Sequence, residues 1–351
     1  YERSWGISNP ETGSLYATDD IFRIASMTKS IASIAVLMLW EEGKFFLDDP
    51  IENYLPAFAN TGILDSFNSD DSSFTTVPNK TKITIRHLLT HTSGIGYGDI
   101  DGNPSIKAIY CKNGLRDIFS PALTTAQGAN QIAKQPLHHE PGAKFTYSLG
   151  IDVLGALVEK VSGISFPQFL RQRIFIPLEM NDTYFDLPKD RHIRLVPVLR
   201  KLGDEWNIFD TDIYDVDYPK AEAKTFYSGG AGLSSTVQDY AKFLQVLIQD
   251  GQGNGHQIIG KKTCELIYEN QLSGIEEWTL GLATGVLGEN ELYQGGKGSS
   301  GTLTWGGYFN TSYFADPEEK IVGLLFKQTQ NIGYDYTTQR FRELVFQSVI
   351  D

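Results

Sequence analysis

A serine and a lysine three positions apart, Ser26 and Lys29, are the first residues in the chain whose types and spacing suggest chemistry. Positions i and i+3 of a helix share a face, so the hydroxyl and the amine are expected within hydrogen-bonding reach. A proton-accepting amine turns an otherwise unreactive serine into a nucleophile. The pair predicts acyl transfer through Ser26, with Lys29 as proton acceptor.

The residues around this pair predict a helix from Ser26 to Glu42 that ends before Gly43. The segment is apolar nearly all round, which predicts burial in the middle of the molecule. Burial favours a neutral amine on Lys29, and the N–H groups at a helix start favour negative charge on Ser26. The alternative is a helix-capping Ser26 with a solvent-exposed Lys29, because so short a motif recurs by chance.

Other catalytic signatures are missing. No G-x-S-x-G occurs, which removes the α/β-hydrolase alternative, and the six histidines form no serine–histidine–aspartate pattern. His91, in "THTSG", is interpreted as a buried structural hydrogen-bonding residue rather than a base. His138-His139-Glu140 is interpreted as a polar loop, since it lacks the HExxH spacing of a zinc peptidase.

Composition bounds the class of protein. The chain has 351 residues, 41% of them hydrophobic, and a formal net charge of -13, which argues against nucleic-acid partners and polybasic membrane attachment. Cys111 and Cys264 are interpreted as unpaired thiols, and no Cys/His spacing suits zinc. Acyl transfer through Ser26 needs no metal or organic cofactor, so none is predicted. No apolar run reaches transmembrane length. The oligomeric state stays open.

The order of the expected elements predicts an α+β molecule with two lobes and one cleft. Residues 60–82 are polar and loop-like, and a helical region follows to about residue 178. The other expected elements are a strand–turn–strand unit at Trp5–Tyr16, helices at Gly150–Val161, Thr236–Gln249 and Phe341–Ile350, and strands at Thr302–Ala315 and Ile321–Phe326.

This order predicts one domain whose sheet is built from both chain ends. Residues 1–60 form the first part of the α/β lobe, 61–225 a mainly helical lobe and 226–351 the second part of the α/β lobe.

Several segments together resemble the superfamily of class C β-lactamases, family VIII carboxylesterases and penicillin-binding proteins. They are "IFRIASMTKSIASIAVLMLWEEGK", "ITIRHLLTHTSGI", "PGAKFTYSLGIDVLGALVEKVSG", "YSGGAGLSSTVQDYAKFLQVLIQDG" and "TWGGYFNTSYFADP". They stand in family order from about Trp5 onward, which is far more specific than any single motif. The resemblance implies a β-lactamase/transpeptidase-like fold, an antiparallel sheet flanked by helices with a mainly helical lobe.

The resemblance also implies roles for individual residues. Ser26 would be the nucleophile and Lys29 its partner. Tyr147, in "Tyr-Ser-Leu", matches the tyrosine that shares general acid and base work with the lysine. A phenol is a poor base unless a nearby cation stabilises the phenolate, and Lys29 is the expected cation.

The third motif of the family reads here as Trp305-Gly306-Gly307. By resemblance, the backbone N–H groups of Ser26 and Tyr308 would form the oxyanion hole, with the Trp305–Gly307 strand lining the substrate site. Two positions depart from β-lactamases. Leu149 replaces an asparagine that binds the substrate amide, and Trp305 replaces a cation for the substrate carboxylate. Both departures favour small esters or amides over β-lactams.

The resemblance therefore predicts a carboxylesterase-like serine hydrolase that forms an acyl-enzyme on Ser26. The alternatives are a D-amino-acid peptidase or amidase, a weak β-lactamase, and acyl transfer to an acceptor other than water. From another class, a non-catalytic sensor domain could keep Ser26 and Lys29 as an acylation switch. The expected partner is a small ester, amide or peptide, selected by the loops Tyr97–Ala133 and Phe185–Phe226.

The start of the chain is not informative about location. It begins at Tyr1 without a visible signal peptide and closer to Ser26 than in relatives. The family's usual N-terminal helix and first strand are missing from it, which is consistent with a processed terminus. The compartment stays open, although the resemblance is compatible with an extracytoplasmic or secreted protein.

Overall fold

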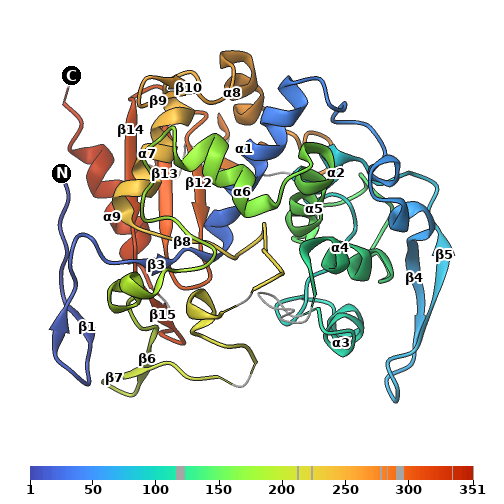
Figure 1. Cartoon of the computed structure of the whole chain (residues 1–351), viewed down its shortest axis with the longest axis horizontal. Coiled ribbons are helices and arrows are strands. Elements are labelled where there is room, and N and C mark those ends of the chain that lie inside the picture. Colours follow the sequence, from blue (N-terminus) through green and yellow to red (C-terminus); the bar gives the residue numbers. More distant parts are fainter. Residues whose placement is uncertain are drawn as a thin grey trace.

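Helices and mainly antiparallel sheets make up the computed structural model of the chain, in agreement with the predicted α+β class (Figure 1). The structure describes residues 1–115, 123–211, 213–222, 224–276, 279–282, 284–289, 296–333 and 335–350.

Helix α1 (Thr28–Glu41) runs between the helical part of the molecule and the main sheet (Figure 1). Apolar side chains surround it, and every residue from Thr28 to Leu39 is buried. A 3-10 turn, Ala25–Met27, precedes it, so the helix predicted from Ser26 to Glu42 is present with a tighter first turn. Gly43 then takes a φ of 69°, a left-handed conformation that glycine adopts without steric cost.

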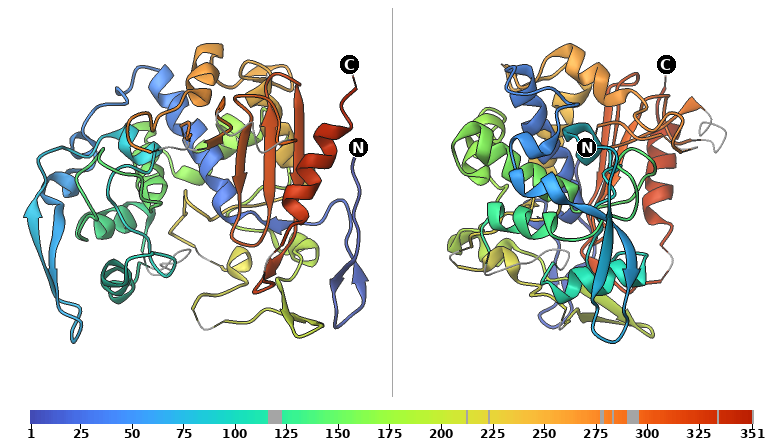
Figure 2. Two further views of the ribbon diagram at one scale, coloured as in Figure 1. Left: turned by 180° about the vertical axis from the view of Figure 1, so that it is seen from behind. Right: turned by 90° about the vertical axis from the view of Figure 1, so that its right-hand side faces the viewer.

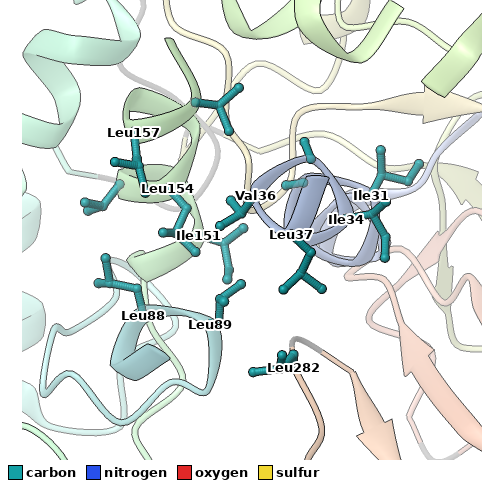
Figure 3. Packing of buried hydrophobic residues seen from close by; sticks show 14 of the residues in the cluster. Ile31, Ile34, Val36, Leu37, Leu88, Leu89, Ile151, Leu154, Leu157 and Leu282 are labelled. Atoms are coloured by element: carbon teal, nitrogen blue, oxygen red, sulfur yellow. The ribbon is translucent and has the colours of Figure 1, made fainter. Parts of the chain in front are cut away.

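The helical part packs on α1 through a continuous apolar core. Its helices are α2 (Ile85–Leu89), α3 (Pro104–Lys112), α4 (Thr125–Ala133), α5 (Gly150–Ser162) and α6 (Phe166–Leu170), which a π-helical turn (Arg171–Phe175) extends. Figure 3 shows side chains of α2 and α5 facing α1, among them Leu88, Leu89, Ile151 and Leu154, with Val36 and Leu37 on the facing side of α1. Burying each such side chain contributes about 2 kcal/mol, which fixes α5 against α1.

The main sheet is antiparallel, with strands β11 (Gly285–Val286), β12 (Leu303–Gly306), β13 (Ser312–Asp316) and β14 (Ile321–Leu325) in that order. The single strand predicted at 302–315 is wrong in one respect, because a tight turn divides it into β12 and β13. The Gly307 N–H donates to the Thr311 carbonyl at 2.7 Å, and Asn310 has a φ of 64°. Apolar residues continue through this turn, so the sequence pattern did not indicate it.

Helices cover both faces of this sheet. Adjacent strand residues point to opposite faces, and Tyr313 contacts Tyr240 of α7 (Val237–Ile248) while Phe314 contacts Phe341 of α9 (Thr337–Gln347). The right-hand view of Figure 2 shows the sheet between α1 and α9. Helix α7 confirms the predicted 236–249 helix, whereas α9 starts and ends earlier than the predicted 341–350.

The N-terminal strands lie outside the main sheet. Strands β1 (Ile7–Asn9) and β2 (Ser14–Leu15) form the predicted hairpin, and β3 (Phe22–Arg23) pairs with β8 (Ser234–Ser235). The expectation of one sheet from both chain ends is therefore wrong for the described residues. The N-terminal segment joins the later chain through β8, directly ahead of Ser26.

Residues 60–82 contain a second difference from the sequence-based expectation. Strands β4 (Gly62–Phe67) and β5 (Phe74–Pro78) form an antiparallel hairpin at the edge of the helical part (Figure 1). Serines and threonines made the segment resemble a loop. Partly buried Ile63, Leu64, Phe67 and Phe74 pack against the core and anchor the hairpin.

The remaining elements are short. They are β6 (Leu199–Leu202), β7 (Glu205–Ile208), β9 (Gln252–Gly253), β10 (His256–Gln257), α8 (Lys261–Tyr268), β15 (Thr329–Gln330) and 3-10 turns at Ile51–Asn53, Pro56–Asn60, Lys189–Arg194 and Tyr218–Lys220. Within the described ranges, no helix has the length and apolar character needed to cross a membrane.

Candidate active site

Ser26 lies in the 3-10 turn at the start of α1. The preceding Ala25 is fully buried and has a φ of 43°, a strained value for a residue with a Cβ, and such strain is common at functional sites. Surrounding bonds hold this turn, since the Tyr240 hydroxyl donates to the Met27 carbonyl at 2.8 Å. The Ser26 side chain makes no capping bond to the helix, so the helix-cap interpretation is wrong.

Lys29 is fully buried and points back toward Ser26. Its Nζ donates to Ser26 Oγ at 3.3 Å, to the Tyr97 hydroxyl at 3.3 Å and to the Gly230 carbonyl at 2.8 Å. Three acceptors match the three N–H groups of a lysine ammonium. The expectation of an exposed first-turn lysine is therefore wrong, and the i, i+3 contact with Ser26 is confirmed.

Tyr147 reaches the same serine from the helical part of the molecule. Its hydroxyl donates to Ser26 Oγ at 2.7 Å. The ring stacks on Tyr97 with centroids 5.3 Å apart and planes 5° apart, and Lys29 Nζ lies 4.6 Å from the Tyr147 centroid. The three residues predicted to act together therefore converge on one oxygen atom.

His91 packs against the Tyr147 ring and forms no hydrogen bond with Ser26 in the described part of the chain. Its Nδ1 accepts the Ser148 backbone N–H at 3.2 Å, and its ring centroid lies 4.8 Å from that of Tyr147. Burial, and then the charge of Lys29, hold the pKa of His91 well below its usual value. A neutral, fully buried imidazole has a structural role, as the sequence predicts.

Asp152 is a charged neighbour that sequence reasoning missed. This carboxyl group is buried in α5, and its Oδ1 accepts the Ser228 hydroxyl at 2.5 Å and the Gly230 N–H at 3.2 Å. Its Oδ2 has no hydrogen-bond partner among the described residues. Burial raises the pKa of Asp152, while the charge of Lys29 opposes that shift. Asp152 thus fixes the glycine whose carbonyl accepts from Lys29.

Gly230 could not be another residue in this arrangement. A Cβ atom at this position would lie 2.6 Å from Asp152 Oδ2. One signal in the sequence could have identified the carboxyl group, because an aspartate in an apolar helix five residues after Tyr147 requires a partner.

The predicted oxyanion-hole segment approaches Ser26 from the sheet. A Cβ on Gly307 would lie 2.4 Å from the Ile24 carbonyl, so the end of β12 touches the chain just before the serine. Tyr308 follows in the same turn and is 39% exposed. Gly306 is exposed, and a Cβ at this position would make only an ordinary contact with the Thr311 carbonyl oxygen, at 3.4 Å.

Trp305 and Leu149 have different surroundings. The Trp305 ring is partly buried, with its centroid 6.1 Å from that of Tyr147, so the two rings lie close to each other. The Leu149 side chain is only 4% exposed and belongs to the apolar core. Position 149 therefore presents no polar group to the cleft.

In the part of the chain that the structure describes, no group of three or more His, Cys, Asp or Glu side chains is placed to hold a metal ion. Among the described residues, Cys111 and Cys264 form no disulfide.

Comparisons with known proteins agree with this geometry. The family model "Beta-lactamase" matches residues 1–345. Protein Rv1367c of Mycobacterium tuberculosis is 30% identical over 343 residues, which cover 92% of this chain and 81% of that protein. Esterase EstB of Burkholderia gladioli is 29% identical over 351 residues, which cover 95% of this chain and 83% of the esterase.

A solved structure gives the same result for the fold. The chain superposes on EstCE1, described as a hydrolase with promiscuous acyltransferase activity, with a TM-score of 0.81 at 25% identity. The match covers 97% of this chain and 88% of EstCE1. The β-lactamase/transpeptidase-like fold expected from the resemblance is confirmed, and this chain belongs to the beta-lactamase family of serine hydrolases.

Proposed function

We propose that the protein is a carboxylesterase that cleaves small esters through an acyl-enzyme on Ser26. The observation that carries the proposal is the convergence of Tyr147 and Lys29 on Ser26 Oγ, at 2.7 and 3.3 Å. General acid and base groups must lie within such distances of the proton that they transfer.

The reaction begins from the state in which the Tyr147–Lys29 pair has lost one proton, as a phenolate beside an ammonium or a phenol beside a neutral amine, and this pair then removes the proton from Ser26. The serine oxygen then attacks the ester carbonyl carbon, and the Ser26 and Tyr308 N–H groups stabilise the negative oxygen of the tetrahedral intermediate. Tyr147 returns the proton to the alcohol oxygen as the carbon–oxygen bond breaks. Water next attacks the acyl-enzyme, gives its proton to the same pair and releases the acid and free Ser26.

Two positions favour an ester over a β-lactam. Leu149 is buried and apolar, and Trp305 places an indole ring beside Tyr147. Neither side chain carries a charge or an amide group, so neither offers the kind of partner that binds the amide or the carboxylate of a β-lactam. The relatives point the same way, because EstB is named an esterase.

The test combines covalent labelling with turnover. A fluorophosphonate probe should add to Ser26, as located by mass spectrometry of the digested protein, and p-nitrophenyl esters should turn over much faster than a chromogenic cephalosporin. The Ser26→Ala variant should lose both labelling and turnover. An unlabelled Ser26 in the folded protein would rule out the proposal, and a labelled serine with a stalled acyl-enzyme would favour the sensor alternative.

Acyl transfer to an alcohol is the second candidate, supported by the acyltransferase activity stated for EstCE1. The same acyl-enzyme would be attacked by an alcohol in place of water. Adding a primary alcohol to an ester assay should then yield a new ester at the expense of the acid, which chromatography would detect.

A further inference from the structure

A pocket of about 540 Å³ opens beside Tyr147 in the helical part of the molecule. Its walls include the aromatic side chains of Tyr97, Phe145 and Tyr147 and the polar side chains of Asp101 and His138. Tyr147 belongs to both places, because its hydroxyl binds Ser26 Oγ while its ring lines the pocket. Tyr147 therefore links Ser26 to this pocket, although Ser26 is not among the described residues that line it.

A histidine–aspartate pair is built into the pocket wall. His138 Nε2 lies 3.0 Å from Asp101 Oδ2, and the side chains are 15% and 3% exposed. Asp101 also accepts the backbone N–H groups of Tyr97 and Asn103, each at 2.8 Å. Burial raises the pKa of Asp101, but these hydrogen bonds outweigh it and hold the pKa below its usual value. The carboxyl group is thus an ionised acceptor.

This arrangement sets the tautomer of His138. A carboxylate only accepts, so in the neutral imidazole Nε2 carries the proton and Nδ1 carries the lone pair. Across the described residues, the His138 ring bonds to Asp101 alone. In that neutral form, Nδ1 of this pocket-lining histidine is a hydrogen-bond acceptor that no described residue uses.

Asn103 and Thr146 also line the pocket, but the Asn103 side-chain oxygen accepts the backbone N–H groups of Ser105 and Ile106, and the Thr146 hydroxyl bonds to His139. The other lining side chains are apolar or aromatic. Tyr97 and Tyr147 are stacked on each other, and Ile100, 43% exposed, and Pro104 stand at the rim. Ring faces and aliphatic side chains suit an apolar body of about ring size. One fixed acceptor among such surfaces selects for a single donor on that body.

We infer that this pocket is a substrate subsite that receives an apolar half of the ester carrying a hydroxyl, which donates to His138 Nδ1. The inference rests on the proposed ester cleavage and names the substrate class for it. The plainer explanation is that His138 only pairs with Asp101 to hold the loop after Tyr97, and the experiment separates the two.

Two matched pairs of esters test which half carries the hydroxyl. The alcohol pair is 3-hydroxyphenyl acetate and 3-methylphenyl acetate, which share the acyl group. The acyl pair is ethyl 3-(3-hydroxyphenyl)propanoate and its 3-methylphenyl analogue, which share the alcohol. In one pair, kcat/KM should favour the hydroxyl by about fivefold, as one net hydrogen bond allows.

The variant His138→Lys retains an N–H donor toward Asp101 and has no acceptor atom, so it should lower that preference to near unity without lowering the unfolding temperature. His139→Lys is the matched control. His139 bonds to the Glu140 carbonyl and the Thr146 hydroxyl and does not line the pocket, so the preference should persist.

The inference is overturned if neither pair shows a hydroxyl preference, or if His138→Lys retains it. Those results leave ester cleavage itself intact. Absence of turnover on all four esters, together with an unlabelled Ser26, would instead overturn the proposed function and this inference with it.

Discussion

The Tyr147 hydroxyl lies 2.7 Å from Ser26 Oγ although 121 residues separate the two in the chain. Lys29, only three residues from Ser26, is farther from the same oxygen, at 3.3 Å. Tyr147 is therefore the group best placed to exchange a proton with the serine, while Lys29 holds the pair of tyrosine rings and the serine together.

Replacing Tyr147 by phenylalanine should lower kcat/KM for p-nitrophenyl acetate by about 10²- to 10⁴-fold, because general acid–base catalysis contributes that much. The ring and its stacking on Tyr97 remain, so stability should change little. Stopped-flow release of p-nitrophenol measures the acylation step. Tyr54→Phe removes a tyrosine hydroxyl that bonds to Asp49, away from Ser26, and should keep full activity. Equal activities of both variants would contradict the role of Tyr147.

Gly307→Ala should reduce kcat more than it raises KM. The added Cβ would lie 2.4 Å from the Ile24 carbonyl, so the turn must move away from Ser26 and carry the Tyr308 N–H with it. Loss of one oxyanion donor costs about 10²- to 10³-fold in kcat. Gly306→Ala is the matched control, since its nearest atom is the Thr311 carbonyl oxygen at 3.4 Å, an ordinary contact. Steady-state kinetics with similar losses in both variants would refute the proposed oxyanion hole.

Asp152→Asn should lower kcat/KM by roughly tenfold, equivalent to about 1.4 kcal/mol, because it removes the buried negative charge near Lys29. Ser228→Ala removes only one donor to that carboxyl group and should cost less. Parallel pH–rate profiles of the variants and the unaltered protein make the comparison. A profile of Asp152→Asn that matches the original in height and position would show that Asp152 is structural only.

The same variant should change how stability depends on pH. Burial raises the pKa of Asp152 above its ordinary value of 3.8, so the folded protein binds this proton more tightly than the unfolded chain. That contribution is present below pH 3.8 and is lost as the pH rises through the folded pKa. As the pH rises from acid to neutral, the unaltered protein should therefore lose unfolding free energy that the Asp152→Asn variant does not lose. Urea titrations of both proteins at several pH values would measure this difference.

His91 should make the protein less stable in mild acid. Burial lowers the pKa of His91 well below 6.5, so the unfolded chain binds a proton that the folded protein excludes. Stability from this group is present above pH 6.5 and is lost as the pH falls below it. Asn at position 91 retains an acceptor for the Ser148 N–H and cannot titrate. The urea midpoints at pH 7.5 and 5.0 should differ less for His91→Asn than for the unaltered protein. If the two proteins show the same difference, the loss of stability in acid comes from other groups.

Much of the fold could be predicted because its signals are local. The apolar run of α1, the amphipathic run of α7 and the antiparallel pair around the turn before Ile321 each follow from the pattern of neighbouring side chains. The turn at Gly307–Thr311 and the hairpin at Gly62–Pro78 could not, because the apolar run passes through the first and polar residues dominate the second. Strand pairing decided both.

The site divides in the same way. By itself, the sequence determined that Ser26 and Lys29 share a helix face, since side chains three positions apart on a helix are neighbours. Only the tertiary structure decided that Tyr147, Tyr97 and Gly230 surround that pair. Their contacts depend on how α5 and two loops pack against α1, and one of the acceptors is a backbone carbonyl, which has no signature among side-chain types. The buried charge of Asp152 and the pocket beside Tyr147 come from the same packing.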